Sequence, residues 1–242
     1  MSENSMFLEP SSPHREPEEN SRHGRLAFRP GDPLSSPGER GLVEFTGLQG
    51  EQVGAAYVPR VPDDAPLRLV LLLHGAGGAP RQPLDLLQQA ADERHLLLLA
   101  PKSRAATWDV ILEGYGPDVR VIDNLLEKVA AAYRIDALSI GGFSDGASYA
   151  LSLGLGNGDV FDSVLAFSPG FVASLVQHGT PRLFVCHGTD DRVLPIDHCS
   201  RRLVPRLLDE GYDVTYREFE GGHTVPSEIA EEAAMWLEDP AT

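Results

Sequence analysis

Ala-Leu-Ser-Ile-Gly-Gly-Phe-Ser-Asp-Gly-Ala-Ser-Tyr-Ala, at residues 137–150, is the stretch that decides the fold. It opens with a short apolar run at 137–141, typical of a strand buried on both faces. From Asp145 onward, apolar residues recur at helical spacing. Between the two patterns lies a G-x-S-x-G sequence centred on Ser144. Small flanking residues permit a sharp strand-to-helix turn, on which the Ser144 hydroxyl projects clear of the backbone.

The G-x-S-x-G pattern alone is weak evidence, because a chain with 24 glycines produces such a match by chance fairly often. Its place between a predicted strand and a predicted helix makes it informative. The competing interpretation is a glycine-rich turn whose serine only caps the following helix.

Further apolar runs of the same kind predict additional parallel strands. They lie at residues 67–73, 96–100, 163–167 and 183–186, with a more amphipathic last strand at 214–219. Helical patterns fall at about 80–94, 119–133, 145–155, 197–208 and 226–237, the fourth kinked or interrupted by Pro205. Short runs at 26–28, 42–45 and 53–58 predict antiparallel strands before them. The fold class is therefore α/β: a mainly parallel central sheet with antiparallel N-terminal strands, flanked by helices on both faces.

Composition divides the chain into two parts. Residues 1–22 are rich in Ser, Pro, Glu and Asn and predict a disordered tail. We expect residues 23–242 to form a single domain. No secretory signal and no apolar run of membrane-spanning length is visible, which predicts a cytoplasmic protein.

The charge balance excludes some partners. The chain has 36 acidic and 20 basic residues, a formal net charge of −16, which repels phosphate backbones and anionic membranes. We expect a small-molecule ester as the partner, no nucleic acid, no stable membrane insertion and, among oligomers, a homodimer.

A serine nucleophile needs a base, and the base needs an acid to orient it. The loops after parallel strands meet at one edge of the sheet. His223 follows the last predicted strand, after a glycine pair that lets the chain bend toward the Ser144 turn. Asp190 and Asp191 follow the run at 183–186, and either serves on chemistry alone. The order Ser144, Asp191, His223 is the chain order expected for triads on such sheets.

The segment His74-Gly75-Ala76-Gly77-Gly78 follows the first predicted parallel strand. Its small residues leave backbone amides free to bind an oxyanion, together with the amide of Asp145. The alternative is a phosphate-binding loop, but no Lys-Ser/Thr follows it and the G-x-G-x-x-G spacing is absent.

The alternative for His187, Asp190, Asp191 and His198 is a metal site. These residues lack the ligand spacing of helical or hairpin metal sites. We expect no metal and no organic cofactor.

Together, several segments resemble the α/β-hydrolase superfamily, and within it the phospholipase/carboxylesterase branch of acyl-protein thioesterases and small bacterial esterases. They are LLLHGAGG at 71–78, GGFSDGAS at 141–148, AFSPGF at 166–171, HGTDDRVLP at 187–195 and GGH at 221–223. The resemblance implies the α/β-hydrolase fold and catalytic Ser144, Asp191 and His223. It also places the oxyanion hole on the amides of Ala76 and Asp145.

Two details of the sequence bear on which branch of the α/β-hydrolase superfamily the chain resembles. Acyl-protein thioesterases commonly have Gln after the nucleophile, where this chain has Asp145. The AFSPGF and GFSDG segments also resemble bacterial esterases related to polyhydroxyalkanoate depolymerases.

The expected function is a serine carboxylesterase that hydrolyses small or short-acyl carboxylic esters or thioesters through an acyl-enzyme. One alternative is a lysophospholipase or acyl-protein thioesterase. Other enzyme alternatives are a peptidase and a lactone or dienelactone hydrolase. A non-catalytic α/β-hydrolase used as a ligand receptor or scaffold is the alternative from another class.

Two loops at the carboxyl edge are expected to shape the substrate pocket. The loop at 102–118 carries Trp108, which either walls the pocket or packs in the core. The loop at 168–180 carries Phe171, with the same alternatives. Neither loop is long enough for a large helical lid, which favours small or short-acyl esters.

Overall fold

The part of the chain described by the computed structural model comprises residues 20–33, 38–62, 65–112, 114–174 and 176–238. Most of the predicted tail, residues 1–19, lies outside these ranges. Residues 20–22 are helical, and Ser21 is fully buried. Helical, buried structure is therefore already present before the predicted boundary at residue 22.

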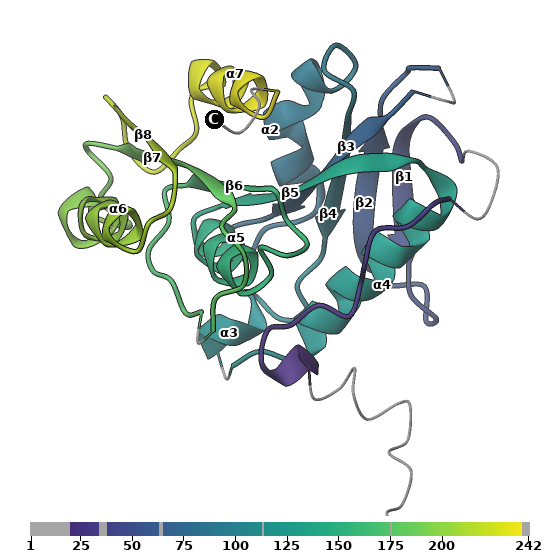
Figure 1. Cartoon of the computed structure of the whole chain (residues 1–242), viewed down its shortest axis with the longest axis horizontal. Helices are drawn as coiled ribbons and strands as arrows, with labels where there is room; N and C mark the ends of the chain where they lie inside the picture. Colours follow the sequence, from purple (N-terminus) through teal and green to yellow (C-terminus); the bar gives the residue numbers. More distant parts are fainter. Residues whose placement is uncertain (1–19, 34–37, 63–64, 113, 175, 239–242) are drawn as a thin grey trace, which may run out of the picture.

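An eight-stranded sheet runs through the centre of the molecule, in the order β1-β2-β4-β3-β5-β6-β7-β8 (Figure 1). The strands are β1 Gly41–Thr46, β2 Gln52–Val58, β3 Leu67–Leu73, β4 Leu96–Pro101, β5 Ile135–Phe143, β6 Ser163–Phe167, β7 Arg182–Gly188 and β8 Val214–Phe219. β2 pairs antiparallel with β1 and with β4, and every pair from β4 to β8 is parallel. The predicted fold class is confirmed.

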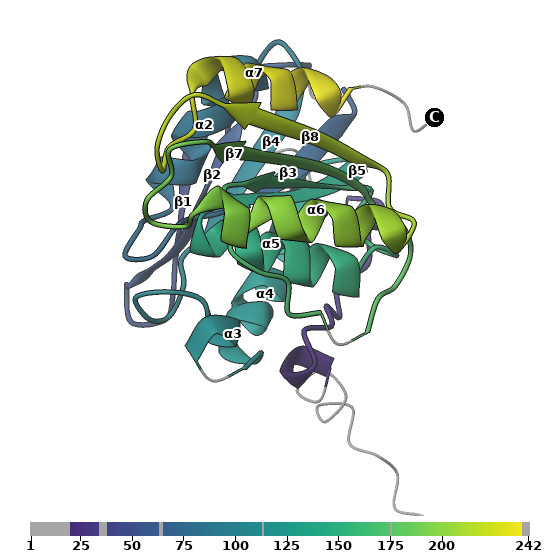
Figure 2. The same ribbon diagram turned by 90° about the vertical axis from the view of Figure 1, so that its left-hand side faces the viewer.

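Helices cover both faces of this sheet, as Figure 2 shows. They are α2 Arg81–Ala91, α3 Asp109–Leu112, α4 Pro117–Ala132, α5 Asp145–Gly156, α6 Ser200–Asp209 and α7 Ser227–Trp236, with a short 3₁₀ helix at Ile196–His198. No helix within the described ranges is both long enough and apolar enough to span a membrane.

The central strand β3 is buried on both faces, which explains why the parallel strands are continuously apolar. Leu69, Leu71 and Leu73 join a core that includes α4, α5 and α6, whereas Val70 and Leu72 join a second core under α2 and α7. Alternate side chains of a strand point to opposite faces of a sheet. Both faces of β3 are covered, so each of these positions must be apolar.

Helix α6 differs from its prediction in where it is interrupted. The break falls at Cys199, between the 3₁₀ helix and α6, whereas Pro205 lies inside a continuous helix. Pro205 and Arg201, whose carbonyl loses its usual helical partner, are both on the exposed side of α6. Water can solvate that carbonyl, so the proline is tolerated.

Residues 26–28 are predicted as a strand, but they lie in a segment, residues 24–28, that pairs with no strand of the sheet. In Figure 1 this purple segment runs along α4. The alternation that suggested a strand is real, because Leu26 and Phe28 are buried at 1% and 4% exposure. Their amides are paired with side chains instead of a neighbouring strand: Leu26 donates to Asn157 Oδ1 at 2.9 Å and Phe28 to Asp123 Oδ1 at 3.0 Å.

Asn157 should be an important anchor of this segment. Its side chain is fully buried, and its Nδ2 also donates to the carbonyls of Gly24 and Leu153, each at 2.8 Å. Replacing Asn157 with Ala leaves these buried backbone groups without hydrogen-bond partners. We therefore expect the free energy of unfolding, measured by urea denaturation, to fall by about 2 kcal/mol. The exposed amide Gln49→Ala is the control and should change it by less than about 0.5 kcal/mol. Equal values for the two variants would contradict the assigned role.

Candidate active site

Ser144 occupies a strained turn between β5 and α5. Its backbone has φ 58° and ψ −121°, a conformation that non-glycine residues rarely adopt. A Cβ on Gly142 would lie 2.4 Å from the Gly146 carbonyl oxygen, and one on Gly146 would lie 2.2 Å from that of Leu73. Only glycine fits at either position, as the sequence argument required. The Ser144 amide donates to the Phe167 carbonyl at 2.9 Å, which ties the turn to the end of β6.

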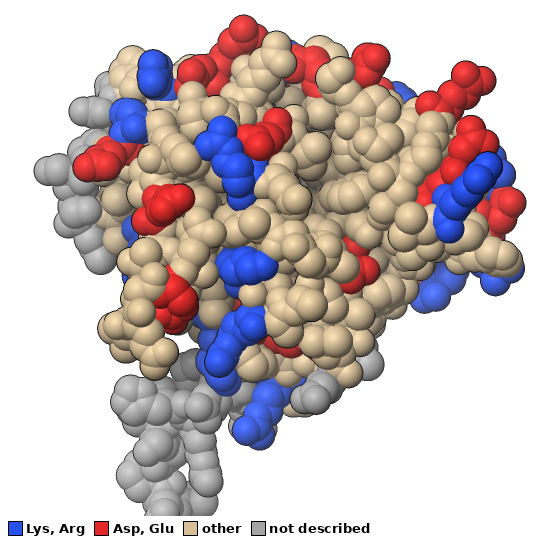
Figure 3. All heavy atoms as spheres, turned by 180° about the vertical axis from the view of Figure 1, so that it is seen from behind, with Lys and Arg blue, Asp and Glu red and all other residues tan. Residues whose placement is uncertain are grey.

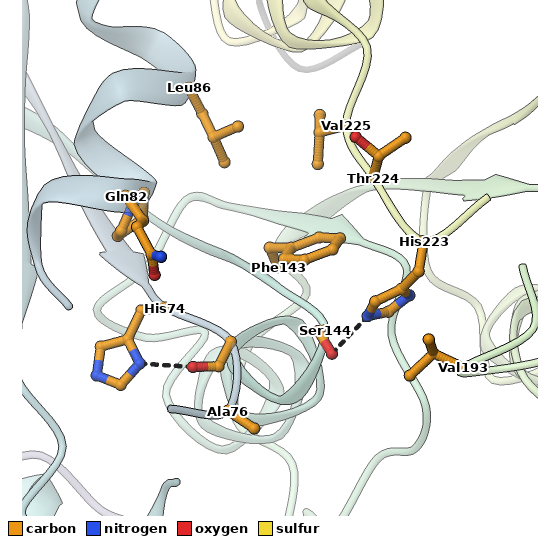
Figure 4. A pocket seen from close by; sticks show the side chains of 12 residues that line it. His74, Ala76, Gln82, Leu86, Phe143, Ser144, Val193, His223, Thr224 and Val225 are labelled. Atoms are coloured by element: carbon orange, nitrogen blue, oxygen red, sulfur yellow. Dashed lines mark hydrogen bonds between the residues drawn. The ribbon is translucent and has the colours of Figure 1, made fainter. Parts of the chain in front are cut away.

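The imidazole of His223 lies between Ser144 and Asp191. Its Nδ1 donates to Asp191 Oδ2 at 2.6 Å, and its Nε2 accepts a hydrogen bond from Ser144 Oγ at 2.8 Å (Figure 4). The Phe143 ring packs against the imidazole with centroids 4.6 Å apart. The structure thus brings together the side chains that the sequence suggested as nucleophile, base and acid. With Nδ1 protonated, Nε2 is free to accept the serine proton.

Asp191, and not its neighbour Asp190, faces the histidine. The Asp191 side chain is buried, and its Oδ1 accepts the amides of Val193 and Leu194, both at 2.9 Å. Burial acts to raise the pKa of Asp191, but the hydrogen bond from His223 and the two amides outweigh it and hold this pKa below its ordinary value. Asp190 is exposed. The carboxylate that orients His223 therefore stays ionised near neutral pH.

His187 contacts Asp191 and the loop that carries it, a role that the sequence did not reveal. Its Nε2 donates to the Leu194 carbonyl at 2.8 Å and lies 3.3 Å from Asp191 Oδ2, while its Nδ1 accepts from Ser200 Oγ at 2.7 Å. Burial lowers the pKa of His187. A neutral imidazole therefore fixes the loop that carries the acid. The available signal was its position at the end of β7, directly before that loop.

The segment after β3 is held so that the amide of Ala76 is turned away from its neighbours. The carbonyl of Gly75 accepts His74 Nδ1 at 2.8 Å and the Gly78 amide at 3.0 Å. Because a trans peptide points its C=O and N–H in opposite directions, this fixes the direction of the Ala76 N–H. Within the described residues, the amides of Ala76 and Asp145 make no protein hydrogen bond. Both donors remain available for an oxyanion.

The Asp145 side chain is also fixed in place. Its Oδ2 accepts a hydrogen bond from Thr107 Oγ1 at 2.6 Å. Thr107 is nearly buried and comes from the loop between β4 and α3. This contact positions the first turn of α5, and the sequence analysis did not foresee it.

The sequence leaves two alternatives for Trp108 and Phe171, the pocket wall or core packing, and the structure places neither side chain in the wall. Trp108 is fully buried, stacks on Tyr149 with centroids 5.2 Å apart, and donates its Nε1–H to the His74 carbonyl at 2.8 Å. It therefore holds the oxyanion segment from the core side. Phe171 does not line the cavity beside Ser144. Its loop is drawn onto α5 by the hydrogen bond from the Gly170 amide to Ser148 Oγ at 2.9 Å, on the other face of the sheet.

The cavity beside Ser144 has a volume of about 490 Å³ (Figure 4). It is lined by His74, Gly75, Ala76, Gln82, Pro83, Leu86, Phe143, Ser144, Val193, His223, Thr224 and Val225. Most of the wall is apolar, and half of its residues come from α2 and the segment after β8. Its volume lies in the range of small-molecule sites.

The buried histidines predict how stability depends on pH. Burial lowers the pKa values of His187 and His74 in the folded protein, below the 6.5 of an unfolded chain. Between the lowered values and 6.5, the unfolded chain binds protons that the folded protein does not. The free energy of unfolding should therefore fall as the pH drops from about 7.5 to 5.5.

Urea denaturation across this pH range checks the prediction. His187→Gln removes one of the titrating groups and should give a shallower pH dependence than wild type, whatever its effect on absolute stability. His198→Gln, at an exposed histidine, should keep the wild-type slope. If the free energy of unfolding of His187→Gln depended on pH as steeply as that of wild type, His187 would not contribute to the pH dependence.

A serine on a strained strand-to-helix turn, within reach of a His–Asp pair at the edge of a mostly parallel sheet, is the arrangement of the α/β-hydrolases. The chain belongs to the phospholipase/carboxylesterase family, whose sequence profile matches residues 119–239. No curated protein is significantly similar in sequence.

Solved structures of esterases resemble the protein. Esterase PE8 is 26% identical over 76% of this chain and 97% of its own, with a TM-score of 0.63. A thermostable esterase is 23% identical over 81% of this chain and 61% of its own, with a TM-score of 0.65. FphF, a fluorophosphonate-binding serine hydrolase of Staphylococcus aureus, shares the fold at 15% identity, covering 84% of this chain and 100% of its own, with a TM-score of 0.67.

Proposed function

We propose that the protein is a serine carboxylesterase that hydrolyses small or short-acyl carboxylic esters or thioesters through an acyl-enzyme. The observation that carries the proposal is the continuous hydrogen-bonded line from Asp191 through His223 to Ser144 at the end of an apolar cavity. Membership of the phospholipase/carboxylesterase family and the likeness to esterase PE8 support it.

In the first half of the reaction, His223 Nε2 takes the proton of Ser144 while Oγ attacks the ester carbonyl carbon. Asp191 stabilises the imidazolium that forms, and its bonds to the Val193 and Leu194 amides keep it oriented. The oxygen of the tetrahedral intermediate accepts the amides of Ala76 and Asp145. His223 then gives the proton to the leaving alcohol or thiol, and the acyl group remains on Ser144.

In the second half, water takes the place of the leaving group. His223 removes a proton from this water as its oxygen attacks the acyl-enzyme, and the same amides hold the oxyanion. Transfer of the proton to Ser144 Oγ releases the carboxylic acid. His223 thus carries each proton between Ser144, the leaving group and water, and the two amides stabilise the oxyanion in both halves.

The strained turn at Ser144 contributes to catalysis through pre-organisation. The hydroxyl is held 2.8 Å from the base before substrate arrives, so little motion is needed to start the attack. The nearby Asp145 amide begins α5, where the helix dipole favours negative charge. The same turn thus supplies both the nucleophile and one oxyanion donor.

Replacing Ser144 with Ala should remove the activity. We expect kcat/KM for p-nitrophenyl butyrate to fall by at least about a thousandfold, with loss of fluorophosphonate labelling. Ser174→Ala, whose Oγ bonds only to the Val176 carbonyl within the described chain, is the control and should keep both properties. Equal labelling and turnover in wild type and Ser144→Ala would refute the proposal. Labelling of Ser144 without turnover of any ester would instead favour the receptor alternative.

The adjacent aspartates provide a matched pair for the acid. Asp191→Asn removes the charge that stabilises the imidazolium and favours the wrong tautomer, so we expect kcat to fall by roughly a thousandfold or more. Asp190→Asn changes an exposed side chain and should alter kcat by less than about threefold. Ester hydrolysis at saturating substrate measures both, and the reverse ranking would assign the acid to Asp190.

A further inference from the structure

The cavity beside Ser144 ends at Leu86 of α2 and Val225 of the segment between β8 and α7. Figure 4 shows these side chains above the Phe143 ring, on the side away from Ala76. Both residues also line a second groove of about 670 Å³ between α2 and α7. They are the lining residues shared by the two spaces within the described chain. Two side chains therefore separate the cavity from the groove.

The groove differs in chemistry from the cavity. Its remaining lining residues are Asp85, Gln89, Ala90, Glu93, Ser227, Glu228, Ala230 and Glu231. Asp85 and Glu231 are paired with arginines of α2 and the residues after it, whereas Glu93 and Glu228 have no basic partner within the described ranges. In Figure 3, acidic side chains predominate along the upper edge, the level at which α2 and α7 lie in Figure 1.

The direction of the cavity indicates which part of an ester occupies it, given the proposed function. A carbonyl carbon bonded to Ser144 Oγ carries an oxyanion, a leaving oxygen and an acyl chain. The oxyanion faces the Ala76 and Asp145 amides, and the leaving oxygen must face His223 Nε2 to receive its proton. The acyl chain takes the remaining direction, over Phe143 toward Leu86 and Val225 (Figure 4).

We propose that Leu86 and Val225 determine acyl-chain specificity: their side chains close the acyl end of the cavity and keep the chain out of the acidic groove. Both are partly buried and pack on the core beneath α2 and α7. This packing holds each side chain in place as a wall. Short straight acyl groups fit before the wall, and longer ones must displace it. The inference rests on the proposed esterase function and names its substrate class.

The test compares p-nitrophenyl esters of acetate, butyrate, hexanoate and octanoate in wild type, Leu86→Ala and Val225→Ala. Either alanine variant opens the wall and should raise the octanoate-to-butyrate ratio of kcat/KM by about tenfold or more. A single methylene group that fits into a pocket already changes kcat/KM by about tenfold or more. Leu86→Phe should lower the hexanoate-to-acetate ratio. The exposed residues Leu208 and Val176 supply matched controls, Leu208→Ala and Val176→Ala, which should keep the wild-type profile.

A second series varies the alcohol and keeps the butyryl group fixed. Ethyl, butyl and hexyl butyrate should show the same relative kcat/KM in wild type and Leu86→Ala. A change confined to this alcohol series would overturn the assignment of the cavity to the acyl chain. Unchanged acyl profiles in Leu86→Ala, Val225→Ala and Leu86→Phe would overturn the role of the wall.

Acyl chains that end in a charged group test whether the cavity opens into the groove when Leu86 is replaced with Ala. In Leu86→Ala, a six-carbon acyl chain ending in trimethylammonium should gain at least about fivefold over one ending in carboxylate, relative to wild type, and salt should reduce this gain. No gain would show that the chain does not reach the groove. Fluorophosphonate labelling of Ser144 and turnover of the acetate ester by wild type distinguish the two failures. Both are lost if the proposed esterase function is wrong, and both remain if only the role of the wall is wrong.

Discussion

The close approach of backbone at the Ser144 turn is the constraint on which the site depends. The carbonyls at the end of β3 lie against the first turn of α5 so closely that no side chain fits at Gly146. The same approach brings the segment after β3 beside the nucleophile. The strained φ of Ser144 is therefore maintained by its surroundings: β3 on one side, β6 through the Phe167 carbonyl on another, and α5 ahead. One steric arrangement sets the positions of nucleophile and oxyanion donors together.

The two faces of the sheet play different roles around this turn. On the face of α4 and α5, Trp108 and Tyr149 form a rigid stack that holds the backbone of the oxyanion segment. On the face of α2 and α7, apolar side chains such as Leu86, Phe143 and Val225 border the open cavity. The residues that position the oxyanion segment thus lie on one face, and the cavity lies on the other. This explains why Trp108, on a loop at the carboxyl edge of the sheet, does not line the cavity.

Much of the fold and the set of reactive side chains could be predicted from the sequence, because local patterns specify them. Continuous apolar runs indicate strands covered on both faces, and parallel strands bring the loops of Ser144, Asp191 and His223 to one edge. The sequence left the positions of Trp108 and Phe171 open for a common reason. Periodicity and composition do not indicate toward which face a loop turns, since that depends on hydrogen bonds to distant residues. The wall formed by Leu86 and Val225 joins parts of the chain far apart in sequence, and neither residue stands out alone.

The segment at residues 24–28 has a consequence for the kinetics of the molecule. Its hydrogen bonds to Asn157 and Asp123 join residues 131 and 95 positions apart, and they require α4 and α5 to be in place first. Contacts with such large separations close long loops and tend to form late in folding. Interactions absent from the transition state slow unfolding without speeding folding. We therefore expect the segment to slow unfolding, and so to lengthen the lifetime of the native state, more than it speeds folding.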